Sequence, residues 1–161
     1  MISASAMSAR GSEPGVLHVS EGVISYAVER LEWSLQSDVI LVVGEYTTDS
    51  GPYENDWFIC FLITKDGSWY EASAYARGVN ETLAWLGQHL GGEICLGLTD
   101  STSNESRVIW PLVMQGMPLL EIQRRGPNRT WQRLLQRCGL WFAGVRRRIH
   151  PEVLHAIRQG R

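Results

Sequence analysis

The sequence lacks any run of about 18 consecutive apolar residues, the length that a membrane-spanning helix requires. It also lacks the apolar core of a secretory signal, because residues 1–15 are rich in Ser, Ala and Gly. We therefore expect a mobile leader over 1–15, no integral membrane insertion and a cytoplasmic protein. Apolar residues make up 44% and charged residues 20% of the chain, which is typical of a globular protein and argues against wholesale disorder.

Cysteine is scarce, since the three cysteines at positions 60, 95 and 138 are too few and too widely spaced for a disulfide framework. No C-x-x-C pair occurs, and the four histidines form no H-x-x-x-H pair, so the ligand spacings of a zinc site are missing. We expect no metal and no cofactor. We interpret Cys60 and Cys95 as buried small residues on strands, and Cys138 as part of the apolar face of a C-terminal helix.

The motifs of phosphate binding and of nucleophilic catalysis are also missing. Neither G-x-x-x-x-G-K-[ST] nor G-x-G-x-x-G occurs, and no serine lies in a G-x-S-x-G turn. A small enzyme stays a third hypothesis, with Asp56 and Glu71 as its acids and His89 as a further candidate. The wider set of acids from which a catalytic pair could be drawn is Glu45, Asp49, Glu54, Asp56 and Glu71.

Lysine is nearly absent, since Lys65 is the only lysine among fifteen basic residues, and the arginines are unevenly placed. Residues 1–120 carry 15 acids and 5 bases, whereas residues 121–161 carry 2 acids and 10 arginines. An acidic body joined to a cationic tail suits three kinds of partner: its own body or a second copy, nucleic acid, and an anionic membrane surface. Arginine recognises carboxylate and phosphate alike, so the residue type does not choose between them.

The first half of the chain predicts a leading element followed by a three-stranded meander. Residues 20–35 have apolar side chains at helical spacing, which predicts a helix, although Ile24, Tyr26 and Val28 also alternate as they would in a strand. An Asp-Gly turn at 66–67 suits a hairpin, because glycine adopts positive φ at little cost. The strands predicted here cover 16–19, 39–43, 57–63 and 69–76, with a loop over 47–55.

The second half predicts two helices and two or three further strands. Asn80 can cap a helix over 80–90, which ends where Gly91 takes the left-handed position. Apolar residues at helical spacing predict a longer helix over 130–149, which Pro151 stops, and a small helical turn follows through Ile157. The further strands predicted cover 94–98, 107–110 and 117–122, the last as an edge strand because of its proline.

These elements together predict an α+β fold with an antiparallel-rich sheet of about five or six strands. Strands 39–43 and 57–63 are apolar on both faces, so both faces of the sheet must be covered. The cover is expected from the helices at about 20–35, 80–90 and 130–149, or from a second subunit.

The chain is expected to divide into the leader 1–15, a sheet domain over 16–122 and a basic amphipathic helical segment over 123–161. That segment would pack on the domain or on a partner. The order of elements is similar to that of compact helix–sheet chaperones, such as the secretion chaperones that dimerise and hold a partner's chain. This similarity lies in the order alone, because no signature residues are shared.

Our first functional hypothesis is a non-catalytic protein-binding module, adaptor-like or chaperone-like, that forms a homodimer and holds a protein partner by its sheet edge or its aromatic surface. Seven tryptophans favour it, because large aromatic side chains bury much area at contact sites with few rotatable bonds. The alternative is that these rings fill the core. The residues predicted to bind a partner are Tyr53, Trp57, Trp69, Trp131 and Trp141.

The second hypothesis is a nucleic-acid-binding protein that uses the arginines of the C-terminal segment. It predicts salt-sensitive binding to any duplex, because arginines that contact phosphates displace counterions. The wide apolar face of the predicted helix favours packing instead, since DNA recognition does not need such a face. The arginines concerned are Arg124, Arg125, Arg129, Arg133, Arg137, Arg146, Arg147 and Arg148.

Overall fold

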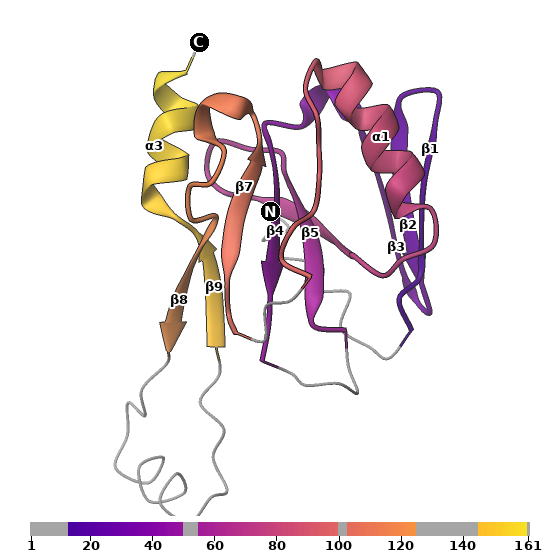
Figure 1. Ribbon diagram of the computed structural model, residues 1–161, viewed down its shortest axis with the longest axis horizontal. Coiled ribbons are helices and arrows are strands. Elements are labelled where there is room, and N and C mark those ends of the chain that lie inside the picture. Colours follow the sequence, from indigo (N-terminus) through magenta and orange to yellow (C-terminus); the bar gives the residue numbers. More distant parts are fainter. Residues whose placement is uncertain (1–12, 50–54, 100–102, 125–144, 161) are drawn as a thin grey trace, which may run out of the picture.

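The structure is a computed structural model that describes residues 13–49, 55–99, 103–124 and 145–160. Within these residues, nine strands and two α-helices form three layers, which Figure 1 shows side by side. The strands pair antiparallel throughout the three sheets, so the predicted α+β class with antiparallel pairing is confirmed. The prediction of a single sheet is wrong, because the strands divide into sheets of four, three and two.

The middle layer is a four-stranded sheet in the order β6-β5-β4-β7. It is built from β4 (Val42–Thr47), β5 (Trp57–Leu62), β6 (Trp69–Ser73) and β7 (Ser106–Trp110). Every residue of β4 and β5 is buried, which agrees with the apolar residues that these strands carry on both faces. A sheet buried in this way needs a covering layer on each side, and the structure supplies both from one chain.

The first covering layer combines a three-stranded meander with a helix. β1 (Val16–Ser20), β2 (Val23–Val28) and β3 (Leu31–Gln36) pair in that order, and α1 (Val79–Leu90) lies beside β1 (Figure 1). The Trp33 indole of β3 points into the middle layer, where its ring centroid lies 5.9 Å from that of Phe61 and 5.2 Å from that of Tyr70. Aromatic packing therefore joins the meander to the central sheet.

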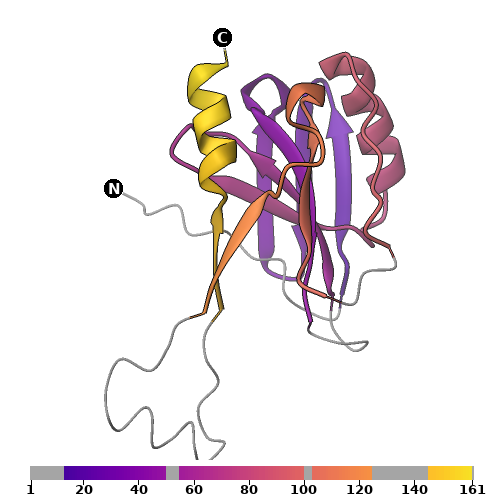
Figure 2. The same cartoon turned by 60° about the vertical axis from the view of Figure 1, so that its left-hand side comes forward.

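The second covering layer is formed by β8 (Leu120–Arg124), β9 (Val145–Ile149) and α3 (Pro151–Gln159), which lie on the opposite side of the central sheet (Figure 2). This layer lies very close to β4, because a Cβ added to Gly44 would lie 2.6 Å from a methyl carbon of Leu119. Only glycine leaves room for the leucine at that position, so the small side chain fixes how near the two layers come.

The helix predicted over 20–35 is wrong, because these residues form β2 and β3. The helical spacing and the alternation of Ile24 and Tyr26 fitted the sequence equally well, and two tight turns decided between them. Glu21 and Gly22 take positive φ between β1 and β2, and Glu29 takes a φ of 48° between β2 and β3. Two-residue turns with positive φ join antiparallel strands, and Glu29 is a residue type that gives no turn signal.

Several predicted strands are correct in kind and shifted at their ends. Residues 16–19, 57–63, 69–76 and 107–110 correspond to β1, β5, β6 and β7, with β6 ending earlier than predicted. The run 39–43 begins as a short 3₁₀ turn (Ser37–Val39), and its strand continues to Thr47 into the predicted loop. The predicted edge strand 117–122 starts later, as β8, and a second 3₁₀ turn (Leu112–Met114) precedes it.

Helix 80–90 is confirmed as α1, and its end at a left-handed Gly91 with a φ of 71° is confirmed as well. The predicted cap is wrong, because Gly78 occupies the N-cap position and no side chain caps the helix. The predicted strand 94–98 is also wrong, since residues 93–98 form no strand. They run beside α1, and two of their N–H groups donate to the side chain of Glu45 instead of to a neighbouring strand.

The helix predicted over 130–149 falls mostly on residues outside the described ranges, but its last turns are wrong. Residues 145–149 form β9, which pairs residue by residue with β8 and so satisfies its backbone groups through the ladder. The helical turn predicted after Pro151 is confirmed and runs longer than expected, as α3 with proline at its first position. The leader 1–15 is described only from residue 13 onward.

Candidate functional site

An open groove lies between α1 and the segment 92–99 that follows it, with a volume of about 770 Å³. Most of its lining is apolar or small, and Glu93 is the one residue of the lining that carries a formal charge. The polar residues stand apart from one another along the two walls. The groove is lined by Trp57, Ala74, Asn80, Leu83, Ala84, Gly87, Gln88, Gly92, Glu93, Ile94, Cys95, Leu96 and Thr99.

Glycines bring the segment 92–99 close against α1. After the left-handed Gly91, the Gly92 N–H donates to the Gly87 carbonyl at 2.9 Å. A Cβ on Gly87 would lie 2.6 Å from the Gly92 carbonyl oxygen, so no larger residue fits there without a backbone shift. Helix α1 and the segment 92–99 therefore form the two walls of the groove.

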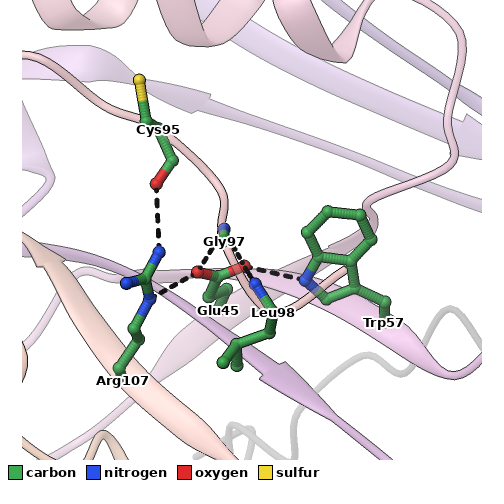
Figure 3. A network of polar contacts seen from close by, with 6 residues as sticks. All are labelled: Glu45, Trp57, Cys95, Gly97, Leu98 and Arg107. Carbon is green, nitrogen blue, oxygen red and sulfur yellow. Dashed lines mark hydrogen bonds and ion pairs between the residues drawn. The ribbon is translucent and has the colours of Figure 1, made fainter. Parts of the chain in front are cut away.

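The second wall is held from below by the Glu45 carboxylate, which is fully buried on β4 (Figure 3). Arg107 Nε donates to Glu45 Oε1 at 2.6 Å, and Trp57 Nε1 donates to Oε2 at 2.8 Å. The backbone N–H of Gly97 donates to Oε1 at 2.9 Å, and that of Leu98 donates to Oε2 at 3.3 Å. A single carboxylate therefore joins two strands of the sheet, the groove's indole and the loop.

The strand register explains how this network assembles. Glu45 lies directly opposite Arg107 in the β4–β7 pair, so their side chains leave the same face of the sheet. The Arg107 guanidinium reaches the loop as well, where Nη2 donates to the Cys95 carbonyl at 3.5 Å. Gly97 makes room for it, since a Cβ there would collide with the guanidinium. A charge buried in this way is stable only when it is paired, and this one is.

Sequence reasoning placed Glu45 among the acids of a possible catalytic pair and missed this structural role. A signal was present, because Glu45 is the one charged residue within an apolar strand that has both faces buried. Such a residue must find several donors, and the donors came from segments far along the chain.

Cys95 contributes a thiol to the groove wall, and it is exposed and off any strand, which corrects the buried strand position predicted for it. Its Sγ donates to Glu93 Oε1 at 3.2 Å. This hydrogen bond, together with the nearby carboxylate charge, raises the pKa of the Cys95 thiol. A nucleophilic cysteine needs the opposite shift, so the thiol is unsuited to that role. Cys60 is buried on β5 as predicted, and burial raises its pKa well above the ordinary value.

Glu93→Gln should speed the alkylation of Cys95 by iodoacetamide at pH 8. The substitution removes the carboxylate that stabilises the thiol form, so the pKa falls and the reactive thiolate fraction rises at that pH. The rate is measured by mass spectrometry in a Cys138→Ser background, where buried Cys60 stays unmodified. Glu105→Gln is the control, because that exposed carboxylate bonds to Ser103. An equal or slower rate in Glu93→Gln would contradict the described contact.

The structure places two of the five predicted partner-binding aromatics. Trp57 is 8% exposed, and it lines the groove while donating to Glu45. Trp69 is half-buried on β6, and its buried Nε1 has no hydrogen-bond partner within the described part of the chain. The other three, Tyr53, Trp131 and Trp141, lie outside the described residues.

Of the eight arginines predicted to bind nucleic acid, the structure describes the side chains of two, Arg147 and Arg148. The Arg147 guanidinium lies over the Tyr46 ring at 5.3 Å and donates to Asn104 Oδ1 at 3.5 Å, whereas Arg148 is exposed. Consecutive residues of a strand point to opposite faces, so Arg147 and Arg148 form no continuous stripe. Arg124 lies on β8 and Arg146 on β9, and the remaining four, Arg125, Arg129, Arg133 and Arg137, lie outside the described ranges.

The residues of the enzyme hypothesis have separate partners. Glu71 is buried and accepts a hydrogen bond from Tyr46, whereas Asp56 accepts one from Tyr75 at 2.9 Å. His89 is exposed near the end of α1 and stacks on Trp85 with ring centroids 4.8 Å apart. Among the residues that the structure describes, no three His, Cys, Asp or Glu side chains are grouped as metal ligands.

No protein-family model, curated protein or solved structure matches the chain. In the described part of the chain, no helix is both long and apolar enough to cross a membrane. The arguments about function therefore depend on the geometry of the groove and of the sheet edges.

Proposed function

We propose that this protein is a non-catalytic protein-binding module whose groove between α1 and residues 92–99 holds a short segment of another polypeptide. The observation that supports it most directly is the groove itself, a volume of about 770 Å³ with an apolar lining. Several side chains of a peptide fit into such a volume, and burying them supplies the affinity.

The chemistry of the lining favours a partner segment with apolar side chains flanked by a basic residue. Leu83, Ile94 and Leu96 offer apolar contacts, and Glu93 offers the one formal charge of the lining. The acidic balance of residues 1–120 adds a longer-range attraction for a basic segment.

The geometry also favours binding over catalysis. The polar lining residues Asn80 and Gln88 lie on α1, and Thr99 lies on the opposite wall, so they do not converge on one point. The thiol of Cys95 is held in its protonated form by Glu93. The one base beside a nucleophile in the described lining is Glu93 beside Cys95, and that contact raises the pKa of the thiol, whereas an activated thiol needs a lowered one.

The groove wall is suited to binding because it is already in place. Four hydrogen bonds hold Glu45 against Trp57, Arg107 and the loop. A loop fixed before the partner arrives loses little conformational freedom on binding, so more of the contact energy appears as affinity.

Ala84→Arg should weaken peptide binding at least tenfold while leaving the fold intact, because Ala84 is exposed on α1 and lines the groove. The probe is a peptide selected against the wild-type protein from a random 12-residue display library. Selected peptides are expected to be enriched in apolar residues next to Lys or Arg. Titration calorimetry should then show at least a tenfold weaker affinity for Ala84→Arg, since a long side chain displaces the ligand.

His89→Arg is the matched control, because it adds a similar charge to an exposed position of the same helix outside the lining. It should bind the peptide with the wild-type affinity. Labelling Cys95 with a bulky maleimide in the Cys138→Ser background should also block binding, since the thiol lies in the wall. Equal binding by Ala84→Arg, by the labelled protein and by the wild type would place the peptide elsewhere and reject the groove.

A further inference from the structure

Within the described part of the chain, the outer edge of β3 has no strand beside it. Val28 and Leu31 flank a two-residue turn and form a hydrogen-bonded pair of the antiparallel ladder. Because such pairs alternate along a strand, Leu31, Trp33 and Leu35 direct their N–H and C=O groups toward β2. The N–H and C=O groups of Glu32 and Ser34 and the N–H of Gln36 therefore point away from β2, and no hydrogen bond to them is found among the described residues. The Gln36 carbonyl belongs to the N-cap of the 3₁₀ turn Ser37–Val39 and accepts the first hydrogen bond of that turn. Glu32, Ser34 and Gln36 are also exposed.

Both edges of the central sheet are covered in part, in contrast to the edge of β3. At β7, Val108 bonds through its N–H to Met117 and through its carbonyl to Gly116, both at 2.9 Å. At β6, the Glu71 carbonyl accepts from Trp33 Nε1 at 3.0 Å. A loop covers part of the β7 edge and a side chain covers part of the β6 edge, whereas no described segment pairs with the edge of β3.

β3 carries few of the devices that keep an exposed edge from pairing, and Glu32 is its one charged residue. The strand contains no proline and no lysine, and its register with β2 has no bulge. An edge of this kind is a template for another strand.

We propose that the open edge of β3 pairs antiparallel with β3 of a second copy of this chain, which joins two three-stranded sheets into one. A two-fold axis through Ser34 places Ser34 opposite its own copy and Glu32 opposite Gln36 of the other copy. About four to six inter-strand hydrogen bonds then form, because three outward residues on each strand each have one N–H to donate, and the Gln36 carbonyl also serves the 3₁₀ turn. The inference concerns a surface other than the groove and does not depend on the proposed peptide binding.

The sequence of β3 is what favours a second copy as the occupant. In the two-fold register residues 32–36 of the two copies pair with one another, and no charged residue faces a like charge, since Glu32 faces the neutral amide of Gln36. The inner-face side chains Leu31, Trp33 and Leu35 are apolar, so the added strand brings apolar side chains beside apolar ones. A closed two-fold pairing also stops after two copies, which a head-to-tail pairing of edges does not.

Sedimentation equilibrium of the full chain from about 1 µM to about 1 mM should show a monomer–dimer equilibrium with Kd in the micromolar range, because strand pairing alone buries less area than a permanent dimer does. Ser34→Pro should leave only monomer, since proline removes the central N–H and its ring occupies the edge. Its circular dichroism should match that of the wild type, because an outward N–H makes no bond within the sheet.

Two opposite substitutions test the register. Gln36→Glu should raise Kd by about 2- to 30-fold, since it sets two pairs of like charges face to face, and Gln36→Lys should lower Kd at low salt by a similar factor. Hydrogen exchange should show the amides of Glu32, Ser34 and Gln36 protected only at high protein concentration.

Three results would overturn the proposal. One is a monomer at every concentration. Another is a dimer that none of the three variants changes, which would use a different surface. The third is protection of the β3 amides that appears only when a different protein is added, which would make β3 a site for a foreign strand.

Discussion

Replacing either Phe58 or Phe61 by alanine should lower the free energy of unfolding by about 3–5 kcal/mol. The two rings lie on opposite faces of β5, and their exposures are 1% and 0%. Phe58 stacks on Tyr46 with centroids 5.2 Å apart, whereas Phe61 contacts Trp33 of the first covering layer. Each substitution leaves a cavity that close-packed neighbours fill only in part.

The comparison between the two variants tests the three-layer architecture. Urea denaturation followed by tryptophan fluorescence gives both free energies, and similar losses are expected because both faces are covered. Val113→Ala is the control, since this side chain is 89% exposed, and it should change stability by less than about 0.5 kcal/mol. A loss below about 1 kcal/mol for one phenylalanine alone would mean that its face is not packed as described.

Glu45→Ala should lower the free energy of unfolding by about 2–4 kcal/mol, because it removes the shared acceptor of the indole and of two backbone donors. The Trp57 indole N–H would then be buried without an acceptor, and this accounts for most of the expected loss in the free energy of unfolding. Arg107 adds less, since its side chain is 38% exposed and water can solvate it in part.

The same substitution should loosen the groove wall before it unfolds the protein. Hydrogen exchange at Gly97 and Leu98 should rise well beyond the effect expected from the global loss of stability, since their N–H groups lose their acceptor. Glu121→Ala, at an exposed position of β8, is the control and should leave both the stability and this exchange unchanged. If Gly97 and Leu98 exchange in Glu45→Ala at the same rate as in the wild type, the carboxylate does not hold the groove wall.

Local sequence patterns correctly predicted several elements of the fold. The apolar runs that became β4 and β5 predicted strands buried on both faces, and the prediction that both faces must be covered was right. Gly91 marked the end of α1, and Pro111 follows the last residue of β7. Each of these signals depends on a backbone conformation that a single residue type favours or forbids.

The errors share one cause, which is competition between patterns that only distant contacts decide. Residues 20–35 fit a helix and a hairpin alike, and the hairpin formed because its Trp33 face packs on Phe61 and Tyr70. Residues 94–98 read as a strand, but no neighbouring strand reaches them. The N–H groups of Gly97 and Leu98 bind Glu45 instead, which lies some fifty positions earlier in the chain.

The α+β class and the two-sided burial of the central strands were predictable from the amino-acid pattern alone, because they follow from composition and from spacings of a few residues. Three features could be seen only once the chain was folded: Glu45 meets Arg107 beside a loop, α1 and residues 92–99 line a groove, and no described segment pairs with the outer edge of β3. Those features arise where segments far apart in the chain come together. Hydrophobic periodicity indicates the type of each element and its buried face, but it does not specify which elements will be neighbours.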